Sequence, residues 1–125
     1  WFDAVVARYA VMVNGIDWWA VTKMDVLDTF ETIKIGVAYE LDGKVTHSMP
    51  SRIEDFGRCV PVYEEMPGWN CSTKEVTKYE DLPPEAKAYI DRLEVLTGAR
   101  AGIVSVGPRR SETMFRDTPR ETAGV

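Results

Sequence analysis

Histidine, cysteine and long apolar runs are scarce in this chain of 125 residues, and each scarcity excludes a class of protein. The one histidine, His47, offers neither a set of zinc ligands nor a nucleophile–histidine–acid triad, and we expect it to be exposed beside a hairpin strand. The two cysteines, Cys59 and Cys71, lack Cys-x-x-Cys spacing, so we expect them to be reduced rather than paired in a disulfide. No apolar run approaches the ~20 residues that cross a bilayer, which argues against a membrane protein.

The charge balance excludes a further class. The formal net charge is −5 and the chain has no block of Lys and Arg, so a nucleic-acid partner is not expected. With 45% hydrophobic and 28% charged residues, the composition is that of a globular protein with one real core. No signal peptide is visible and the chain begins with Trp1 rather than methionine, so we expect a segment cut from a longer, cytoplasmic protein.

The most informative motif is Thr22-Lys23-Met24-Asp25, which follows an apolar run at residues 16–21 that is typical of a short buried strand. An aspartate carboxylate at such a strand end can accept two parallel hydrogen bonds, from the N1–H and the exocyclic amine of guanine. Adenine offers an acceptor at the first of these positions. The lysine stem can lie across the base with its ammonium in water. The motif therefore predicts a guanine site, although chance matches to so short a pattern are common.

A second apolar, β-branched run at residues 101–106 stops at Gly107-Pro108. Both runs lack strict alternation, which is typical of strands covered on both faces of a parallel sheet. Ligands of such sheets bind beyond the carboxyl ends of the strands, so the two strand ends are expected to form two walls of one pocket. Gly107 would let backbone approach a flat ring, and Pro108 would offer a rigid apolar edge. The alternative is that this motif is only a turn that ends the strand.

The remaining helix and strand signals alternate along the chain. The expected elements are a helix at 2–13, strands at 18–21 and 33–41, a hairpin turn at Asp42-Gly43, a strand at 44–47, a loop with a short helical turn at 48–57, an edge strand at 60–64, an irregular stretch at 70–80, a helix at 82–97 and a strand at 101–106. The predicted fold class is α/β, with part of a mixed, largely parallel central sheet, flanking helices and a β-hairpin. Residues 1–115 form one domain in this prediction, and residues 116–125 form a loose polar tail.

Several other features have a structural interpretation that we prefer. Glu64 and Glu65 are adjacent, so on a strand they point to opposite faces and cannot form a catalytic carboxylate pair. Asp28 is expected to cap or brace the turn after the guanine motif. Arg109 and Arg110 are expected to be surface charges, with nucleotide phosphates as the alternative partners. The tryptophans are expected in the core rather than as stacking platforms for a base: Trp18, Trp19 and Trp69.

Seven separate motifs stand in a matching order that resembles one family. They are Trp1-Phe2-Asp3, Val11-Met12-Val13-Asn14-Gly15, Thr22-Lys23-Met24-Asp25-Val26-Leu27-Asp28, Ile33-Lys34-Ile35-Gly36-Val37-Ala38-Tyr39, Tyr63-Glu64-Glu65-Met66-Pro67-Gly68-Trp69, Tyr79-Glu80-Asp81-Leu82-Pro83 and Val104-Ser105-Val106-Gly107-Pro108. In this order they are similar to the carboxy-terminal portion of adenylosuccinate synthetase. The resemblance extends to about Met114 and is specific, because so many motifs agree in order and spacing.

The resemblance implies a GTP-dependent ligase that joins IMP and L-aspartate to give adenylosuccinate, uses Mg²⁺, and works as a cytoplasmic homodimer. It also implies an incomplete P-loop NTPase-like fold. The family holds the guanine of GTP with a Lys-x-Asp motif and a Ser-x-Gly motif, and Pro108 matches a position that borders the base. Met24 stands where leucine is commoner and is expected to contribute only packing. The GTP-binding residues implied by position are Lys23, Met24, Asp25, Ser105, Val106 and Gly107.

The same resemblance implies what these residues lack. In the family, the phosphate loop, the catalytic aspartate and histidine, and the magnesium ligands belong to the earlier part of the chain, and the aspartate-binding loop ends just before Trp1. No catalytic or metal-binding residue is therefore expected here, and the isolated polypeptide is expected to be inactive. The alternative function is a stand-alone, non-catalytic nucleotide-binding or interaction module.

Overall fold

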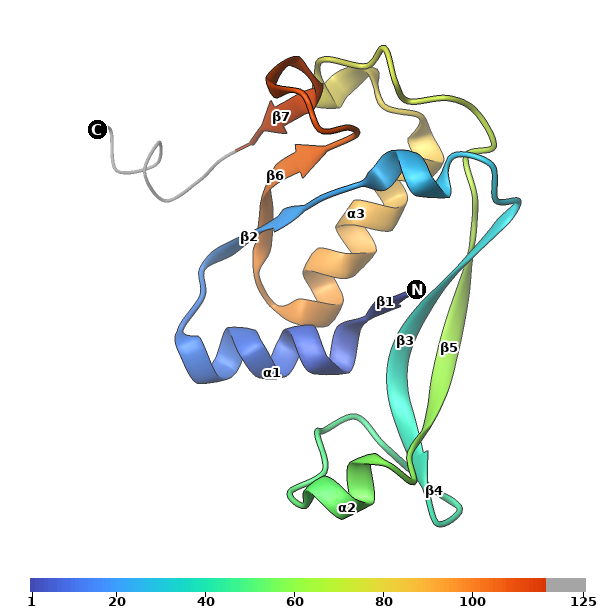
Figure 1. The fold of residues 1–125 in the computed structure, drawn as a ribbon, viewed down its shortest axis with the longest axis vertical. Coiled ribbons are helices and arrows are strands. Elements are labelled where there is room, and N and C mark those ends of the chain that lie inside the picture. Colours follow the sequence, from blue (N-terminus) through green and yellow to red (C-terminus); the bar gives the residue numbers. More distant parts are fainter. Residues whose placement is uncertain (117–125) are drawn as a thin grey trace.

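Figure 1 shows the computed structural model, which describes residues 1–116. These residues form strands, α-helices and short 3₁₀ helices. In chain order they are β1 (Phe2–Asp3), α1 (Ala4–Asn14), β2 (Trp18–Val21), η1 (Met24–Leu27), β3 (Thr32–Leu41), β4 (Lys44–Thr46), α2 (Ile53–Phe56), β5 (Val60–Pro67), η2 (Tyr79–Asp81), α3 (Pro84–Thr97), β6 (Arg100–Ser105), η3 (Arg110–Glu112) and β7 (Thr113–Phe115).

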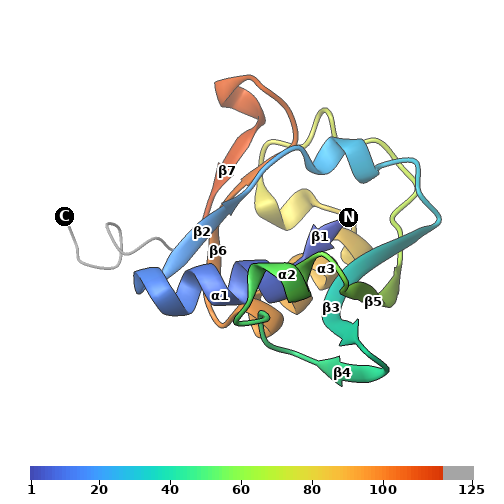
Figure 2. The same cartoon turned by 60° about the horizontal axis from the view of Figure 1, so that its bottom comes forward.

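The strands divide between two sheets. In the first sheet, the long strand β3 pairs in parallel with β1 and antiparallel with β4 and β5. In the second sheet, β6 pairs in parallel with β2 and antiparallel with β7. Figures 1 and 2 both show α3 between the two sheets. The expected α/β class with mixed strand directions is confirmed. The expectation of one largely parallel central sheet is wrong for residues 1–116, because the described strands form two sheets in which only β1–β3 and β2–β6 pair in parallel.

Helix α3 joins the sheets into one core. It begins at Pro84, two residues later than predicted, and stops at Gly98 as predicted, where the backbone is left-handed (φ 78°). Its buried face packs in the same apolar cluster as Ile33 and Ile35 of β3 and Val104 of β6. The buried residues of α3 recur at helical spacing: Ala86, Tyr89, Ile90, Leu93 and Thr97.

Helix α1 begins two residues later than the sequence predicts. Asp3 has extended backbone (φ −102°, ψ 100°), and its Oδ1 accepts the N–H groups of Val5 at 3.0 Å and Val6 at 3.1 Å. Asp3 is therefore the N-cap, and Phe2 and Asp3 pair with β3 as a short strand. The phenol of Tyr39 donates a hydrogen bond to the other carboxylate oxygen of Asp3, which ties the start of α1 to the middle of the first sheet.

The apolar stripe of α1 is buried only at its start. Ala4 and Val5 lie in the core, whereas Tyr9, Met12 and Val13 are exposed, with Met12 at 71% exposure. The pattern of apolar residues thus predicts the helix but not which part of its apolar face is covered among residues 1–116.

The β3–β4 hairpin is confirmed. Asp42 and Gly43 both have positive φ angles, of 52° and 82°, as a tight hairpin turn requires. Strand β5 is an edge strand, paired with β3 alone, and Pro61 stands opposite Tyr39. It runs to Pro67, three residues farther than predicted, because its pairing with β3 continues to that point.

Arg116, the first residue of the expected tail, is held in the fold by its backbone and its side chain. Its N–H donates to the Gly102 carbonyl at 2.6 Å, and its guanidinium lies 3.1 Å from a Glu94 carboxylate oxygen and 4.2 Å from the centre of the Tyr79 ring. The expected tail therefore begins no earlier than residue 117. Its other residues, 117–125, lie outside the described part of the chain.

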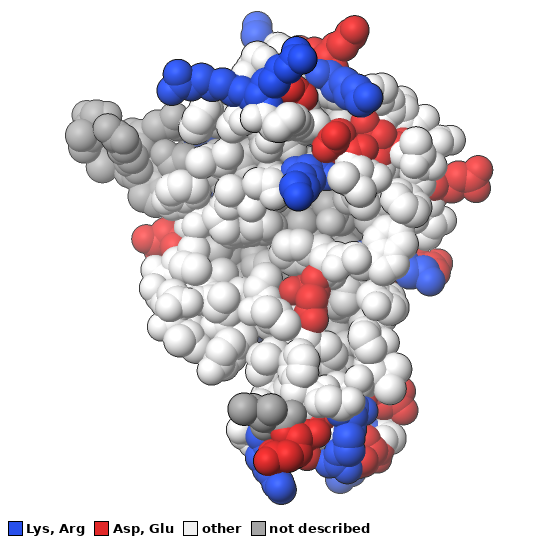
Figure 3. Space-filling view, in the orientation of Figure 1, with Lys and Arg blue, Asp and Glu red and all other residues white. Residues whose placement is uncertain are grey.

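The charged side chains on the face in Figure 3 lie mainly at the two ends of the molecule. No helix within residues 1–116 is long and apolar enough to cross a membrane. In Figure 3, Lys and Arg side chains mix with Asp and Glu at the two ends of the molecule, and mostly uncharged residues lie between. Cys59 and Cys71 are both free thiols, as expected, and Cys71 is exposed.

Glu64 pairs with Arg92 and so links β5 to α3. The Arg92 Nε lies 2.6 Å from Glu64 Oε2 and the Arg92 Nη2 lies 2.7 Å from Oε1, a two-pronged geometry that favours the ionised carboxylate. These hydrogen bonds lower the pKa of Glu64, and partial burial of the carboxyl opposes them. Glu65 is exposed, so the structural interpretation of the adjacent glutamates is confirmed.

We expect this pair to stabilise the fold in a pH-dependent way. Because the pKa of Glu64 is lower in the folded than in the unfolded chain, its contribution is complete above the ordinary carboxyl pKa of about 4.3 and is lost as pH falls through the lowered folded value. Glu64→Gln should therefore unfold at a lower urea concentration than the wild type at pH 6, and the difference should shrink towards pH 3. An equal difference at both pH values would contradict the prediction.

Candidate functional site

The candidate site begins where β2 and β6 end. The two strands are parallel, with Trp18 opposite Arg100 and Val21 opposite Val104. Both carboxyl ends therefore lie at the same edge of the second sheet, so the chain leaves it at neighbouring points at residues 22 and 105 (Figure 1). The two motifs that the sequence places at the ends of buried strands are thus adjacent in the fold, as parallel pairing predicted.

The first wall is the tight turn that follows β2. Lys23 has left-handed backbone (φ 58°, ψ 37°), which costs a residue with a side chain roughly 1–2 kcal/mol. The next four residues form η1, and the Val26 N–H donates to the Lys23 carbonyl at 3.2 Å. Met24 is 1% exposed and packs in the core, whereas Lys23 is exposed and Asp25 is half-buried. Met24 therefore anchors the turn in the core, while Lys23 and Asp25 keep some exposure to solvent.

A buried carboxylate supports this turn from behind. Asp28 is 7% exposed, and its oxygens accept hydrogen bonds from the Trp69 indole N–H at 2.7 Å, the Thr73 N–H at 2.8 Å and the Thr73 hydroxyl at 2.9 Å. Its own N–H donates to the Asp25 carbonyl at 3.1 Å. The expectation that Asp28 braces the turn is confirmed, and Trp69 is a buried residue, as predicted.

The second wall is the loop after β6. The Ser105 hydroxyl donates to the Gly107 carbonyl at 2.6 Å, and the buried Val106 donates its N–H to the Glu112 carbonyl at 2.9 Å. The Glu112 carboxylate also accepts the Arg109 N–H at 3.3 Å. A Cβ on Gly107 would lie 1.6 Å from Glu112 Oε2, so only glycine lets this carboxylate fold against the loop.

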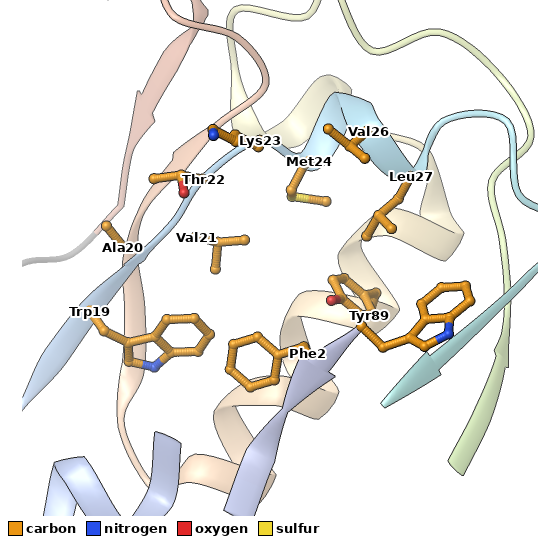
Figure 4. A pocket seen from close by; sticks show the side chains of 11 residues that line it. Phe2, Trp19, Ala20, Val21, Thr22, Lys23, Met24, Val26, Leu27 and Tyr89 are labelled. Carbon is orange, nitrogen blue, oxygen red and sulfur yellow. The ribbon is translucent and has the colours of Figure 1, made fainter. Parts of the chain in front are cut away.

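An apolar cavity of about 540 Å³ opens on the other side of the first wall (Figure 4). Figure 4 shows Met24 pointing into it from η1, Trp19 and Val21 from β2, Phe2 from β1 and Tyr89 from α3. Its lining includes Lys23 and Met24 but neither Asp25 nor any of residues 105–108.

The polar groups of this cavity do not suit a guanine edge. The Trp19 indole N–H donates to the Ala99 carbonyl at 3.0 Å and is already used. Burial raises the pKa of the Tyr89 phenol to about 12, so it stays a neutral hydroxyl. The cavity lining contains no carboxylate, and Asp25 is not among its residues. We therefore place the candidate base site at the strand ends and not in the cavity.

The other singled-out residues lie apart from these walls or on the surface. Arg109 and Arg110 are both exposed, and the Arg109 Nε lies 3.8 Å from Glu112 Oε1. His47 is exposed beyond β4. Trp18 and Trp19 are half-buried rather than fully in the core. Among residues 1–116, no three His, Cys, Asp or Glu side chains are grouped to hold a metal ion, so the donor set here does not fit Mg²⁺ and we assign it no ligand.

Sequence reasoning missed three supporting features of the site. Thr73 is fully buried and hydrogen-bonded to Asp28, although it lies in a polar stretch without periodicity. Glu112 lies in a segment with no apolar pattern. The left-handed backbone of Lys23 has no sequence signal, because lysine is not typical of that conformation.

Comparison with known proteins gives a consistent result. The family model described as adenylosuccinate synthetase matches residues 1–114. The adenylosuccinate synthetases of Desulfotalea psychrophila and Parasynechococcus marenigrum are each 50% identical to this chain, over 98% and 95% of its length. A solved structure titled as a fully ligated adenylosuccinate synthetase from Plasmodium falciparum superimposes with a TM-score of 0.86 at 28% identity, over 94% of this chain. The chain spans 27–28% of the length of these proteins.

The contact between Gly107 and Glu112 predicts a coupled pair of substitutions. Gly107→Ala should force the Glu112 carboxylate away from the Arg109 N–H and lower the free energy of unfolding by about 1 kcal/mol. In a Glu112→Ala background the same change should cost markedly less, because the clashing group is gone. Denaturant unfolding of the two single variants and the double variant measures the coupling. Additive effects would show that the two residues do not touch in solution.

Proposed function

The chain belongs to the adenylosuccinate synthetase family, and from this premise we propose that it is the segment of a GTP-dependent ligase that recognises the guanine base. The observation that carries the proposal is the parallel pairing of β2 with β6, which brings the ends of both motif-bearing strands to one edge. A base between the two walls would meet Lys23 and Asp25 on one side and residues 105–107, bordered by Pro108, on the other.

In this proposal Asp25 supplies the selectivity. Its half-buried carboxylate has no hydrogen-bonding partner among the contacts of the described residues, so both oxygens are available to the N1–H and N2 amine of guanine. Adenine lacks both of these donors at the matching positions. The exposed Lys23 stem lies against the base, and Met24, buried beneath the turn, contributes packing. Ser105 keeps its lone pairs as acceptors, since its hydroxyl hydrogen is used on Gly107.

We propose that the full-length ligase uses GTP to phosphorylate the 6-oxygen of IMP, and that the amine of L-aspartate then displaces phosphate at that carbon. The products are adenylosuccinate, GDP and phosphate. Magnesium would assist at the GTP phosphates, held by residues outside this segment. A cytoplasmic homodimer is part of the same proposal. This chain's own contribution is to hold the base, and so to fix where the γ-phosphate of GTP lies relative to IMP.

Replacing Asp25 tests the base contact directly. Asp25→Asn in the full-length ligase turns one acceptor into a donor that faces the N2 amine. Loss of a charge-assisted hydrogen bond should cost roughly 1.5–3 kcal/mol, so GTP affinity should fall about tenfold to a hundredfold. Xanthosine triphosphate, which carries an oxygen at that ring position, should bind better than it does to the wild type. Titration calorimetry measures the affinities of the wild type and the variant for GTP and for xanthosine triphosphate, and so the change in preference between them.

Asp42→Asn is the matched control. It removes the same charge at the β3–β4 turn, far from the strand ends in Figure 1, and asparagine is well suited to the left-handed backbone at this position. GTP affinity in this variant should equal that of the wild type. An Asp25→Asn variant that binds GTP as tightly as the Asp42→Asn control would exclude the proposed contact.

The isolated 125-residue polypeptide should form no adenylosuccinate from GTP, IMP and L-aspartate, because the groups that clamp phosphate and metal are expected elsewhere in the family's chain. A spectrophotometric assay with the full-length ligase as positive control checks this. Measurable turnover by the polypeptide alone would refute the assignment. GTP binding without turnover, in a native protein of this length, would support the alternative of a stand-alone module.

A further inference from the structure

We propose that Asp28 is a positioning residue for guanine recognition, because its buried carboxylate fixes the geometry of the turn that presents Asp25. The inference rests on the proposed function, since it assumes that Asp25 binds the base. In this inference Asp28, Trp69 and Thr73 affect guanine recognition by holding the turn in place, without contacting the nucleotide themselves.

The turn needs outside support because it begins with strain. Lys23 holds a left-handed backbone that a residue with a side chain adopts only when its surroundings impose it. Inside the turn, the hydrogen bonds from Val26 to Lys23 and from Asp28 to Asp25, at 3.2 and 3.1 Å, each span only three residues. Such a short 3₁₀ segment does not hold its shape alone. The buried side chain of Met24 fixes one end of the turn, and the Asp28 carboxylate fixes the other.

The hydrogen bonds that the Asp28 carboxylate accepts, called the tether below, hold it rigidly. Three donors on two residues converge on its two oxygens: the Trp69 indole N–H and the N–H and hydroxyl of Thr73. The carboxylate and Thr73 are both buried, at 7% and 0% exposure, so water does not compete for these hydrogen bonds. None of the three donors is a cation, so the geometry of the acceptors, rather than charge pairing, decides the strength of the tether.

The donors themselves are anchored in the fold. Trp69 packs on Tyr89 of α3, with ring centres 5.9 Å apart, and belongs to the main apolar cluster. The Gly68 N–H donates to the Glu31 carbonyl at 2.8 Å, which joins the same loop to the chain just after the turn. The hydrogen bonds of Asp28 therefore fix the position of Asp25 relative to the core. If these hydrogen bonds are lost, the Asp25 carboxylate should remain present but no longer hold a fixed orientation towards the base.

The test is Asp28→Asn in the full-length ligase. The amide oxygen can still accept the indole N–H, but the amide nitrogen would face the Thr73 N–H. We expect the KM for GTP to rise about tenfold, with kcat and the KM values for IMP and L-aspartate within about twofold of wild type. The preference for GTP over inosine triphosphate, which lacks the N2 amine, should shrink, because that preference depends on where Asp25 points.

Two further variants keep the test decisive if Asp28→Asn does not fold. Thr73→Val keeps the shape and the backbone N–H but removes the hydroxyl, so it should raise the KM for GTP by about threefold. Thr73→Ser restores the hydroxyl and should return the KM for GTP to the wild-type value. Glu64→Gln is the control for stability, because it breaks a hydrogen-bonded pair between β5 and α3 without touching the turn.

The outcomes separate this inference from the proposed function. If Asp28→Asn and Thr73→Val lower the melting temperature as Glu64→Gln does, yet leave the KM for GTP and the GTP preference unchanged, Asp28 is only structural and the inference is overturned. If Asp25→Asn also leaves nucleotide preference unchanged, the proposed base site itself fails. A changed preference in Asp25→Asn alone overturns the inference and leaves the proposed function standing.

Discussion

The parallel ladder between β2 and β6 is the constraint on which the rest of the site depends. It joins two segments from opposite ends of the chain and gives them the same direction, so both leave the sheet at one edge. Antiparallel pairing would have sent residues 22–25 and 105–108 to opposite edges. Helix α3 makes the pairing possible, because it precedes β6 directly and its buried face packs beneath the sheet.

Each wall at that edge is supported by a carboxylate that accepts backbone N–H groups. Asp28 accepts the N–H of Thr73 behind the first wall, and Glu112 accepts the N–H of Arg109 behind the second. Each carboxylate binds a backbone N–H group in a segment outside the strands and α-helices, at Thr73 and at Arg109. This arrangement resembles a helix cap more than a salt bridge, since it satisfies backbone donors and fixes a turn without requiring a cation.

Local signals in the sequence predicted most of the fold. The Asp42-Gly43 hairpin, the buried face of α3 and the positions of β2 and β6 all follow from short-range patterns. The prediction that β2 is a buried strand is wrong for most of its length, since Val21 is buried but Trp18 and Trp19 are half-buried and Ala20 is exposed. The division into two sheets and the exposure of the second half of α1 do not, because they depend on which distant segments come together. The same limit applies to the site. Lys23 and Asp25 stand in a motif, whereas Thr73 lies in an irregular segment and its contact with Asp28 has no short-range signal.

The exposed thiol of Cys71 lies between the two residues that hold Asp28. An alkylating or fluorescent reagent can reach this sulfur in the folded protein, which places a reporter inside the segment that supports the base site. The same exposure is a liability, because oxidation of the thiol would add a charged group two residues from each anchor of the tether. If Asp25 binds the base as proposed, nucleotide selectivity would then respond to the redox conditions of the preparation, although no cysteine lies in either wall.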